Sequence, residues 1–178
     1  MKYLIGVSLI QLIGIAAFSQ QFKPSDTGSS ITFSIKNFGF ETSGSFTGLD
    51  GKISFDPADV RSDSFDMSID ANTINTDNNM RDSHLRKEEY FDVRKYPRIR
   101  FVSSSVSVDR NAHFTATGKL TIKNTTKDMS IPFTVTSKDG GYLFTGEFKL
   151  NRKDYHVGGS STISNNLTVH FSIFARKQ

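Results

Sequence analysis

The segment MSIPFTVTSKDGGYLFTGEFKL, residues 129–150, carries the clearest indication of the fold. Apolar and polar residues alternate on both sides of Asp139-Gly140-Gly141, and a period of two is typical of strands with one buried face. An Asp-Gly pair between two such runs favours a tight hairpin turn. The segment therefore predicts two antiparallel strands whose shared face, carrying Phe133, Phe144 and Phe148, points into an apolar interior.

The same alternation recurs outward from this hairpin in both directions. It is found in the ranges 31–35, 53–55, 65–69, 114–122 and 167–173. About eight or nine short strands with turns roughly every ten residues indicate an antiparallel barrel or sandwich. Closing the sheet removes exposed edges, and the chain has no cysteine with which to form disulfides. We therefore predict an all-β fold, an extended antiparallel eight-stranded lipocalin-like barrel in one domain over residues 20–178.

The first nineteen residues have the pattern of a secretory signal peptide. Lys2 precedes an apolar run, and Ala17-Phe18-Ser19 provides a small-x-small cleavage site. A membrane-spanning helix needs about 20 apolar residues, and Gln11 interrupts a shorter run. Residues 1–19 are thus predicted to be a signal peptide, and the protein to be exported, either periplasmic or secreted.

One stretch breaks the alternation, RDSHLRKEEYFDVRKYPRIR, residues 81–100, with seven basic and four acidic residues. We predict a short helix over residues 78–87, capped by Thr76 or Asp77 and lying across the barrel mouth. The apolar Leu85 and Tyr90-Phe91 should dock on the barrel rim and hold the charges around the opening. Arginines there could bind a phosphate through two hydrogen bonds. A basic excess this local does not suit a nucleic-acid partner.

Catalytic and metal-binding patterns are weak. The chain has no Gly-x-Ser-x-Gly elbow and no thiol, and Ser160 and Ser161 follow Gly158-Gly159 in a polar, turn-like stretch. Two of the four histidines, His113 and His170, have the outward parity of their strands, and no two histidines have a ligand spacing such as i, i+4. We predict no catalytic residue, no metal and no cofactor.

The run NTDNNMRDSHLRKEEYFDVRKYPRIRF, residues 75–101, closely resembles the central signature of the YceI-like family, exported bacterial lipid-binding proteins with a lipocalin-like barrel. The resemblance extends through residues 29–57, 117–133 and 151–159. It implies a barrel that encloses a polyisoprenoid or similar long-chain amphiphilic lipid, with an isoprenoid quinone or a prenyl phosphate as examples. The tail would lie in the barrel and the polar head at the mouth.

The candidate site residues divide into two sets. The resemblance implies a mouth and head-group set of Arg81, Asp82, His84, Leu85, Phe91 and Asp92. Strand parity predicts a tail-binding set of Ile31, Phe33, Ile35, Phe101, Leu120, Phe133, Phe144, Phe148 and Phe171. The chain departs from the family at His156, where a glycine is common, and His156 could narrow one end of the cavity or add a polar contact. Asn124-Thr125 also replaces a commoner glycine-containing turn.

Three functions remain open from the sequence. The first is non-enzymatic carriage, storage or sequestration of a lipid, in which transient membrane contact or a homodimer could take part. The second is an enzyme that modifies a lipid or quinone head group, with His84 as acid or base near Asp82 or Asp92. The third is an envelope interaction protein with a packed barrel, for which the charged segment would be the docking surface.

Overall fold

The computed structural model describes residues 20–159 and 162–178, so the predicted signal peptide and the pair Ser160-Ser161 lie outside the described residues. The strands are β1 (Gln20–Asn37), β2 (Phe40–Phe46), β3 (Asp50–Phe55), β4 (Ser64–Asp70), β5 (Arg98–Val108), β6 (Phe114–Ile122), β7 (Thr125–Lys138), β8 (Gly141–Asn151) and β9 (Ile163–Lys177). The helices are α1 (Asn79–Leu85) and the 3-10 turns η1 (Val60–Ser62), η2 (Ala71–Thr73) and η3 (Arg152–Tyr155).

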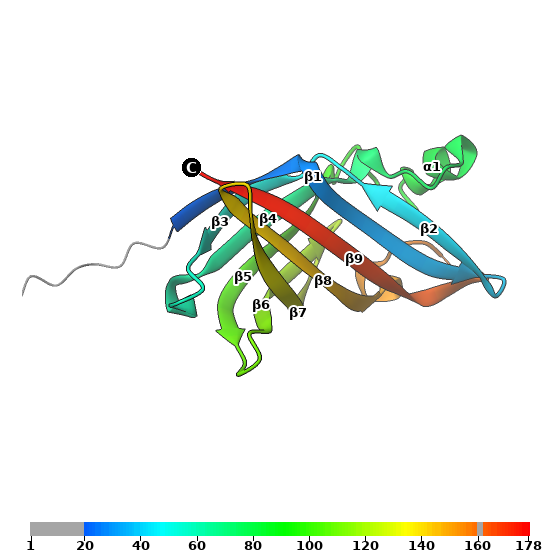
Figure 1. Ribbon diagram of the computed structural model, residues 1–178. Coiled ribbons are helices and arrows are strands. Elements are labelled where there is room, and N and C mark those ends of the chain that lie inside the picture. The colour runs from blue at the N-terminus through cyan, green and yellow to red at the C-terminus, as the bar shows by residue number, and fades with distance from the viewer. Residues whose placement is uncertain (1–19, 160–161) are drawn as a thin grey trace, which may run out of the picture.

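Eight of the strands close into an antiparallel barrel (Figure 1). Strands β3 to β9 pair in sequence order, and β1 closes the ring because it pairs with β9 along one edge and with β3 through Phe22 and Ile53 along the other. The turn at Asp139-Gly140 joins β7 to β8, as the sequence predicts. The predicted all-β eight-stranded barrel is confirmed.

Strand β2 stands outside this ring. It pairs with the second half of β1, from Ile31↔Phe46 to Asn37↔Phe40. Within the described residues its other edge has one bridge, between Ser45 and Asn75, with N–O distances of 2.8 and 3.0 Å. The β1–β2 hairpin therefore extends the barrel wall beyond the closed ring. Its tip lies at the same end of the molecule as α1 (Figure 1).

The opposite end of the barrel is packed with aromatic rings. Phe55 is fully buried, and its ring centroid lies 5.4 Å from Phe114, 5.3 Å from Tyr142 and 5.2 Å from Phe144, each in an edge-to-face arrangement. Such pairs add about 0.5–1.5 kcal/mol beyond area burial. Phe65 and Phe133 join the same cluster. This aromatic plug closes one end, so any hollow in the barrel must open at the other.

Helix α1 differs from its predicted limits. It spans Asn79–Leu85, shorter than the predicted residues 78–87, and its N-cap is Asn78, whose side-chain oxygen accepts a hydrogen bond from the Arg81 N–H at 2.9 Å. Thr76 and Asp77 were the wrong cap residues. Thr76 instead donates to Asp82 from both its N–H and its hydroxyl, so it is already engaged when the helix begins.

A buried carboxyl near the plug predicts a pH-dependent stability. Asp63 is 7% exposed; one of its oxygens accepts the Asp56 N–H at 2.8 Å and the other has no partner among the described residues. Burial raises the pKa of Asp63 to about 6, from an ordinary 3.8. The unfolded chain therefore ionises this group first, and the free energy of unfolding should fall by on the order of 2 kcal/mol as pH rises from about 4 to above 6. Urea titrations across that range test this, and Asp63→Asn should flatten the profile; an unchanged slope in that variant would contradict the assignment.

Candidate functional site

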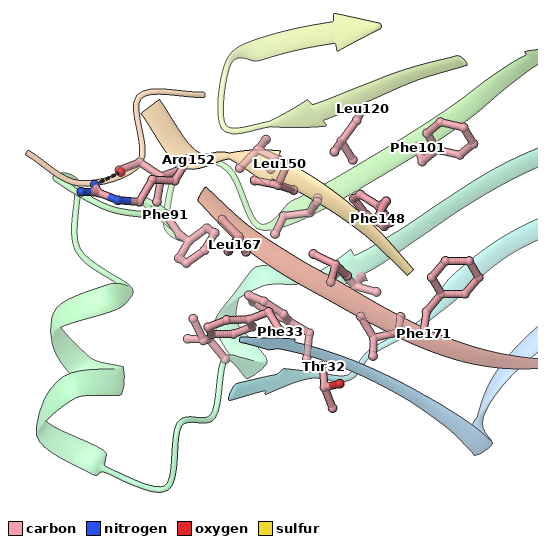
Figure 2. A pocket seen from close by; sticks show the side chains of 18 of the residues that line it. Thr32, Phe33, Phe91, Phe101, Leu120, Phe148, Leu150, Arg152, Leu167 and Phe171 are labelled. Atoms are coloured by element: carbon pink, nitrogen blue, oxygen red, sulfur yellow. Dashed lines mark hydrogen bonds between the residues drawn. The ribbon is translucent and has the colours of Figure 1, made fainter. Parts of the chain in front are cut away.

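The inner faces of the strands enclose a cavity of about 280 Å³ with an almost wholly apolar wall. Its lining runs from plug residues such as Phe133 and Phe144 to Arg81 and Leu85 of α1 and Thr42 of the β1–β2 hairpin. Its wall is built by strand alternation, since every second residue of β1, β8 and β9 faces inward. Figure 2 shows such residues from several strands converging on the hollow, among them Phe33, Phe148 and Leu167.

The structure brings the whole predicted tail-binding set together on the cavity wall. Phe133 and Phe144 form the floor, where they also belong to the plug. The strand register places Phe33, Val169 and Phe148 side by side at mid-height. The predicted residues on the wall are Ile31, Phe33, Ile35, Phe101, Leu120, Phe133, Phe144, Phe148 and Phe171. That they contact a ligand stays a prediction. The fully packed barrel considered from the sequence does not agree with this hollow.

Other wall residues were missed by the sequence analysis. Leu167, Val169 and Ile173 on β9 share the parity of Phe171, so the alternation that identified Phe171 was sufficient to find them. Phe46 and Arg152 lie outside the strands that the alternation identified. No periodic signal points to them, because β2 and the turn after β8 are positioned by contacts with distant parts of the chain.

The mouth is formed in part by the segment that the sequence singled out. Arg81, Leu85 and Phe91 line the cavity. The Arg81 Nε donates to the Thr76 hydroxyl at 2.7 Å, and Nη2 donates to the Thr76 carbonyl at 2.5 Å. Within residues 20–159 and 162–178 its Nη1 has no hydrogen-bond partner, so this edge of the guanidinium can donate to a polar group in the mouth.

The other three predicted mouth residues are not on the wall. Asp82 is 4% exposed, and one carboxylate oxygen accepts both Thr76 bonds, at 2.9 and 2.5 Å. Asp82 thereby fixes Thr76, which in turn holds Arg81. His84 is exposed, and its ring packs edge-on against Tyr90 at 4.9 Å. Asp92 occupies a left-handed turn, φ 47°, whose carbonyl accepts two backbone N–H bonds. These three residues therefore contact the segments around the mouth and do not line the cavity itself.

Apolar residues of the charged segment dock on the rim, as predicted. The Phe91 ring lies edge-on to Phe46 of β2 at 5.6 Å. Tyr90 and Phe91 also pack against a buried cluster that includes Ile122, Tyr155 and Val157. Burying such side chains contributes about 1.5–3 kcal/mol each. The segment is therefore attached to the barrel by its aromatic residues.

Whether arginines at the mouth bind a phosphate stays a prediction, but several basic side chains near the mouth are already engaged within the protein. They donate to main-chain carbonyls: Arg86 to Asn72 and Ile74, both at 2.8 Å, Lys123 to Glu88 at 2.8 Å, and Lys153 to Gly158 at 3.1 Å and Gly159 at 2.5 Å. Arg100 forms an exposed pair with Asp66 on neighbouring strands, at 2.6 Å. These charges hold loops in place, and the cavity wall receives few of them.

Arg152 acts in the same way from inside the barrel. It is 6% exposed and borders the cavity. Its guanidinium donates to the carbonyls of Val157 at 2.7 Å, Ser164 at 3.0 Å and Ile163 at 3.2 Å. It therefore joins the turn after β8 to the start of β9 at the edge of the mouth (Figure 2).

His156 is exposed and does not line the cavity, so the expectation that it narrows one end was wrong. It follows η3 in the left-handed conformation, φ 54° and ψ 35°, which glycine adopts more readily than histidine. We expect His156→Gly to stabilise the protein by about 0.5–1 kcal/mol because glycine adopts this conformation without strain. Urea unfolding measures the gain. His156→Ala keeps the strain and should give no increase; an equal increase in both variants would contradict the explanation.

The remaining histidines are placed as their parity predicts. His113 and His170 are exposed and lie 3.3 and 3.2 Å from Asp109 and Glu147. Over the described part of the chain, no cluster of three or more His, Asp or Glu side chains is arranged to hold a metal ion. None of the described helices has the length and apolar character needed to cross a membrane.

Comparison with known proteins agrees with this architecture. Residues 22–175 match the profile of the YceI-like domain. A UPF0312 protein of Shewanella denitrificans is 30% identical over 161 residues, covering 86% of this chain and 84% of its own. The crystal structure of BcnA from Burkholderia cenocepacia superposes with a TM-score of 0.80 at 25% identity, covering 85% of this chain and 98% of that one. A polyisoprenoid binding domain from Saccharophagus degradans shares the fold, with a TM-score of 0.71 at 16% identity and coverage of 90% and 99%. The match spans the closed barrel, its apolar hollow and the signature around Arg81, and this chain is a member of the YceI-like family.

Proposed function

We propose that this protein binds a polyisoprenoid or similar long-chain amphiphile without catalysis, with the tail in the cavity and the head at Arg81. The observation that carries the proposal is the apolar hollow, closed at one end and open at the other. Removing each methylene from water contributes about 0.8 kcal/mol, so a dry wall along the tail supplies most of the affinity. The Saccharophagus degradans domain of the same fold, described as polyisoprenoid binding, supports this choice.

The mouth favours an uncharged head group over a phosphate. A phosphate is best held by bidentate arginines, yet Arg86, Lys123 and Lys153 donate to carbonyls. Arg81 offers its Nη1 edge, which suits one carbonyl or hydroxyl oxygen. Of the two ligand types expected from the sequence, an isoprenoid quinone therefore fits better than a prenyl phosphate.

The role we propose is carriage, storage or sequestration of such a lipid in the cell envelope. The signal-peptide pattern of residues 1–19 supports an exported location. Binding is favoured over catalysis because His84 is not among the residues of the cavity wall and packs on Tyr90, and because a carboxylate oxygen of Asp82 is occupied by Thr76. The enzyme hypothesis thus lacks an acid or base at the place where a head group would lie.

Native mass spectrometry of the purified protein, followed by solvent extraction, tests the proposal. An isoprenoid lipid released in about one copy per chain is the expected result. Protein that carries no lipid and takes up none from detergent solution would overturn it.

Substitution of Arg81 tests the head-group assignment. Arg81→Met should weaken binding of an isoprenoid quinone by about tenfold, the cost of one lost hydrogen bond to a charged donor. A saturated hydrocarbon of similar length, measured as a competitor, should bind both proteins equally. Wild-type protein that prefers a prenyl phosphate to the quinone would contradict the uncharged head group.

A further inference from the structure

Large apolar side chains are exposed at the open end of the barrel. Phe38 is 73% exposed, Phe40 78% and Met80 84%. The first two form the tip of the β1–β2 hairpin, and Met80 lies on α1. Figure 1 shows the hairpin tip and α1 on opposite sides of the same end of the molecule. The apolar residues therefore flank the opening of the cavity.

The backbone at Phe38 is unfavourable for a phenylalanine. Phe38 and Gly39 have φ values of 48° and 83°, the two positive values of a type I′ turn between Asn37 and Phe40. Asn or Gly ordinarily occupies the first position, and a bulky residue there is an outlier. Phe38 thus tolerates local strain while its ring is mostly in water. No contact within residues 20–159 and 162–178 accounts for an aromatic residue at this position.

Phe40 lies outside the cavity, on the face of the hairpin that carries wall residues further along. It pairs directly with Asn37, which lines the cavity, and residues opposite each other in an antiparallel pair share a face. Thr42 and Phe46, two and six residues further along β2, also line the cavity. The inward face of the hairpin therefore runs from Phe40 at the exposed tip, past the polar Asn37 and Thr42, to Ile35 and Phe33 inside the barrel.

The charges at the hairpin tip cancel. Lys36 and Glu41 are direct cross-strand partners next to the tip. The basic excess of residues 81–100 lies on the other side of the opening and includes the exposed Lys87, Arg94 and Lys95. Attraction to anionic lipid needs clustered Lys or Arg, so it would act through that segment and not through the hairpin tip. Insertion of aromatic and Met side chains into the boundary between head groups and acyl chains needs no net charge.

We propose that the hairpin tip and α1 form a membrane-docking rim, defined by Phe38, Phe40 and Met80, which sets the cavity mouth against a lipid bilayer. This inference rests on the proposed function, because a protein that binds a membrane lipid has a reason to contact a bilayer. A bilayer suits separate apolar residues placed around an opening, because its surface contacts all of them at once. A second copy of the chain seated there would cover the mouth.

The direct test is sedimentation with phosphatidylcholine vesicles. Phe38→Asn and Phe40→Thr should each lower the partition coefficient about tenfold, and together about a hundredfold. Asn favours the left-handed conformation of this turn and Thr favours strands, so we expect both variants to retain the fold. Val108→Thr is the matched control, since Val108 is 43% exposed on the β5–β6 hairpin, away from the mouth. Its partition coefficient should equal that of the wild type.

Three results would overturn the rim. One is unchanged partitioning of the double variant. Another is binding that requires phosphatidylglycerol and disappears at high salt, because the charged segment would then be the docking surface. A third is a concentration-dependent dimer that the double variant abolishes without any change in vesicle binding, which would assign the exposed residues to a second copy.

A second measurement separates this proposal from the proposed function. The double variant should bind as much isoprenoid quinone from detergent solution as the wild type, but should extract it from vesicles about tenfold more slowly. Equal extraction rates would count against the rim alone. Absence of quinone in both proteins would refute lipid binding, while the partition measurement would still decide whether the rim meets a bilayer.

Discussion

Val169→Trp is expected to reduce binding of a long-chain lipid roughly a hundredfold. Val169 lies at mid-height on the cavity wall, with Phe33 of β1 on one side and Phe148 of β8 on the other. An indole at this position projects into the space that a tail must pass. Excluding three or four methylenes costs about 2.4–3.2 kcal/mol, which is roughly a hundredfold in affinity. Native mass spectrometry after incubation with an isoprenoid quinone measures the loss.

The matched control is the next residue on the same strand. His170 is exposed on the outer face, so His170→Trp adds the same ring outside the barrel and should leave binding unchanged. The free energy of unfolding of Val169→Trp should stay within about 1–2 kcal/mol of the wild type because the ring fills existing space. Full lipid occupancy in Val169→Trp would show that the ligand lies elsewhere.

Arg152→Met is expected to destabilise the protein by about 3 kcal/mol. The side chain is buried, and its loss removes the donor to the carbonyls of Val157, Ile163 and Ser164. Water does not easily replace a donor at a buried position. For a domain of this size, the melting temperature should fall by roughly 6–12 °C. Calorimetry or thermal circular dichroism measures the shift.

Two further variants separate charge from geometry. Arg152→Lys keeps the charge but not the planar fork that reaches several carbonyls at once, so it should recover only a minor part of the loss. Arg110 is exposed in the loop between β5 and β6, and Arg110→Met should leave the melting temperature unchanged. Arg152→Met protein as stable as the wild type would show that the turn after β8 is held by other contacts.

Seven of the eight barrel strands, all but β5, could be predicted from alternation because each has one face in water and one in the interior. Strand β2 could not. Its inward positions include Thr42 and Gly44, and the absence of a side chain at Gly44 is explained only by the folded structure. A Cβ there would come within 2.5 Å of the Phe33 ring and 2.9 Å of Thr76. Close approach of segments distant in sequence leaves no local signal.

The cavity wall could be predicted from the sequence more completely than the mouth. Inward parity identified Phe33, Phe148 and Phe171 because their direction is fixed by their own strand. The direction of a basic side chain at the mouth depends instead on which carbonyl lies within reach. Arg86 and Arg81 look alike in the sequence, yet Arg86 holds the chain near Ile74 whereas Arg81 keeps one edge toward the cavity.

The aromatic plug around Phe55 makes the hollow a blind tube. A long molecule held in it must leave through the same open end by which it entered, and the narrow cavity does not let it reverse its direction. Whatever end went in first comes out last. If the protein carries a lipid as proposed, an acceptor would therefore always meet the same end of that lipid, and each transfer would preserve its orientation without any recognition of direction by the acceptor itself.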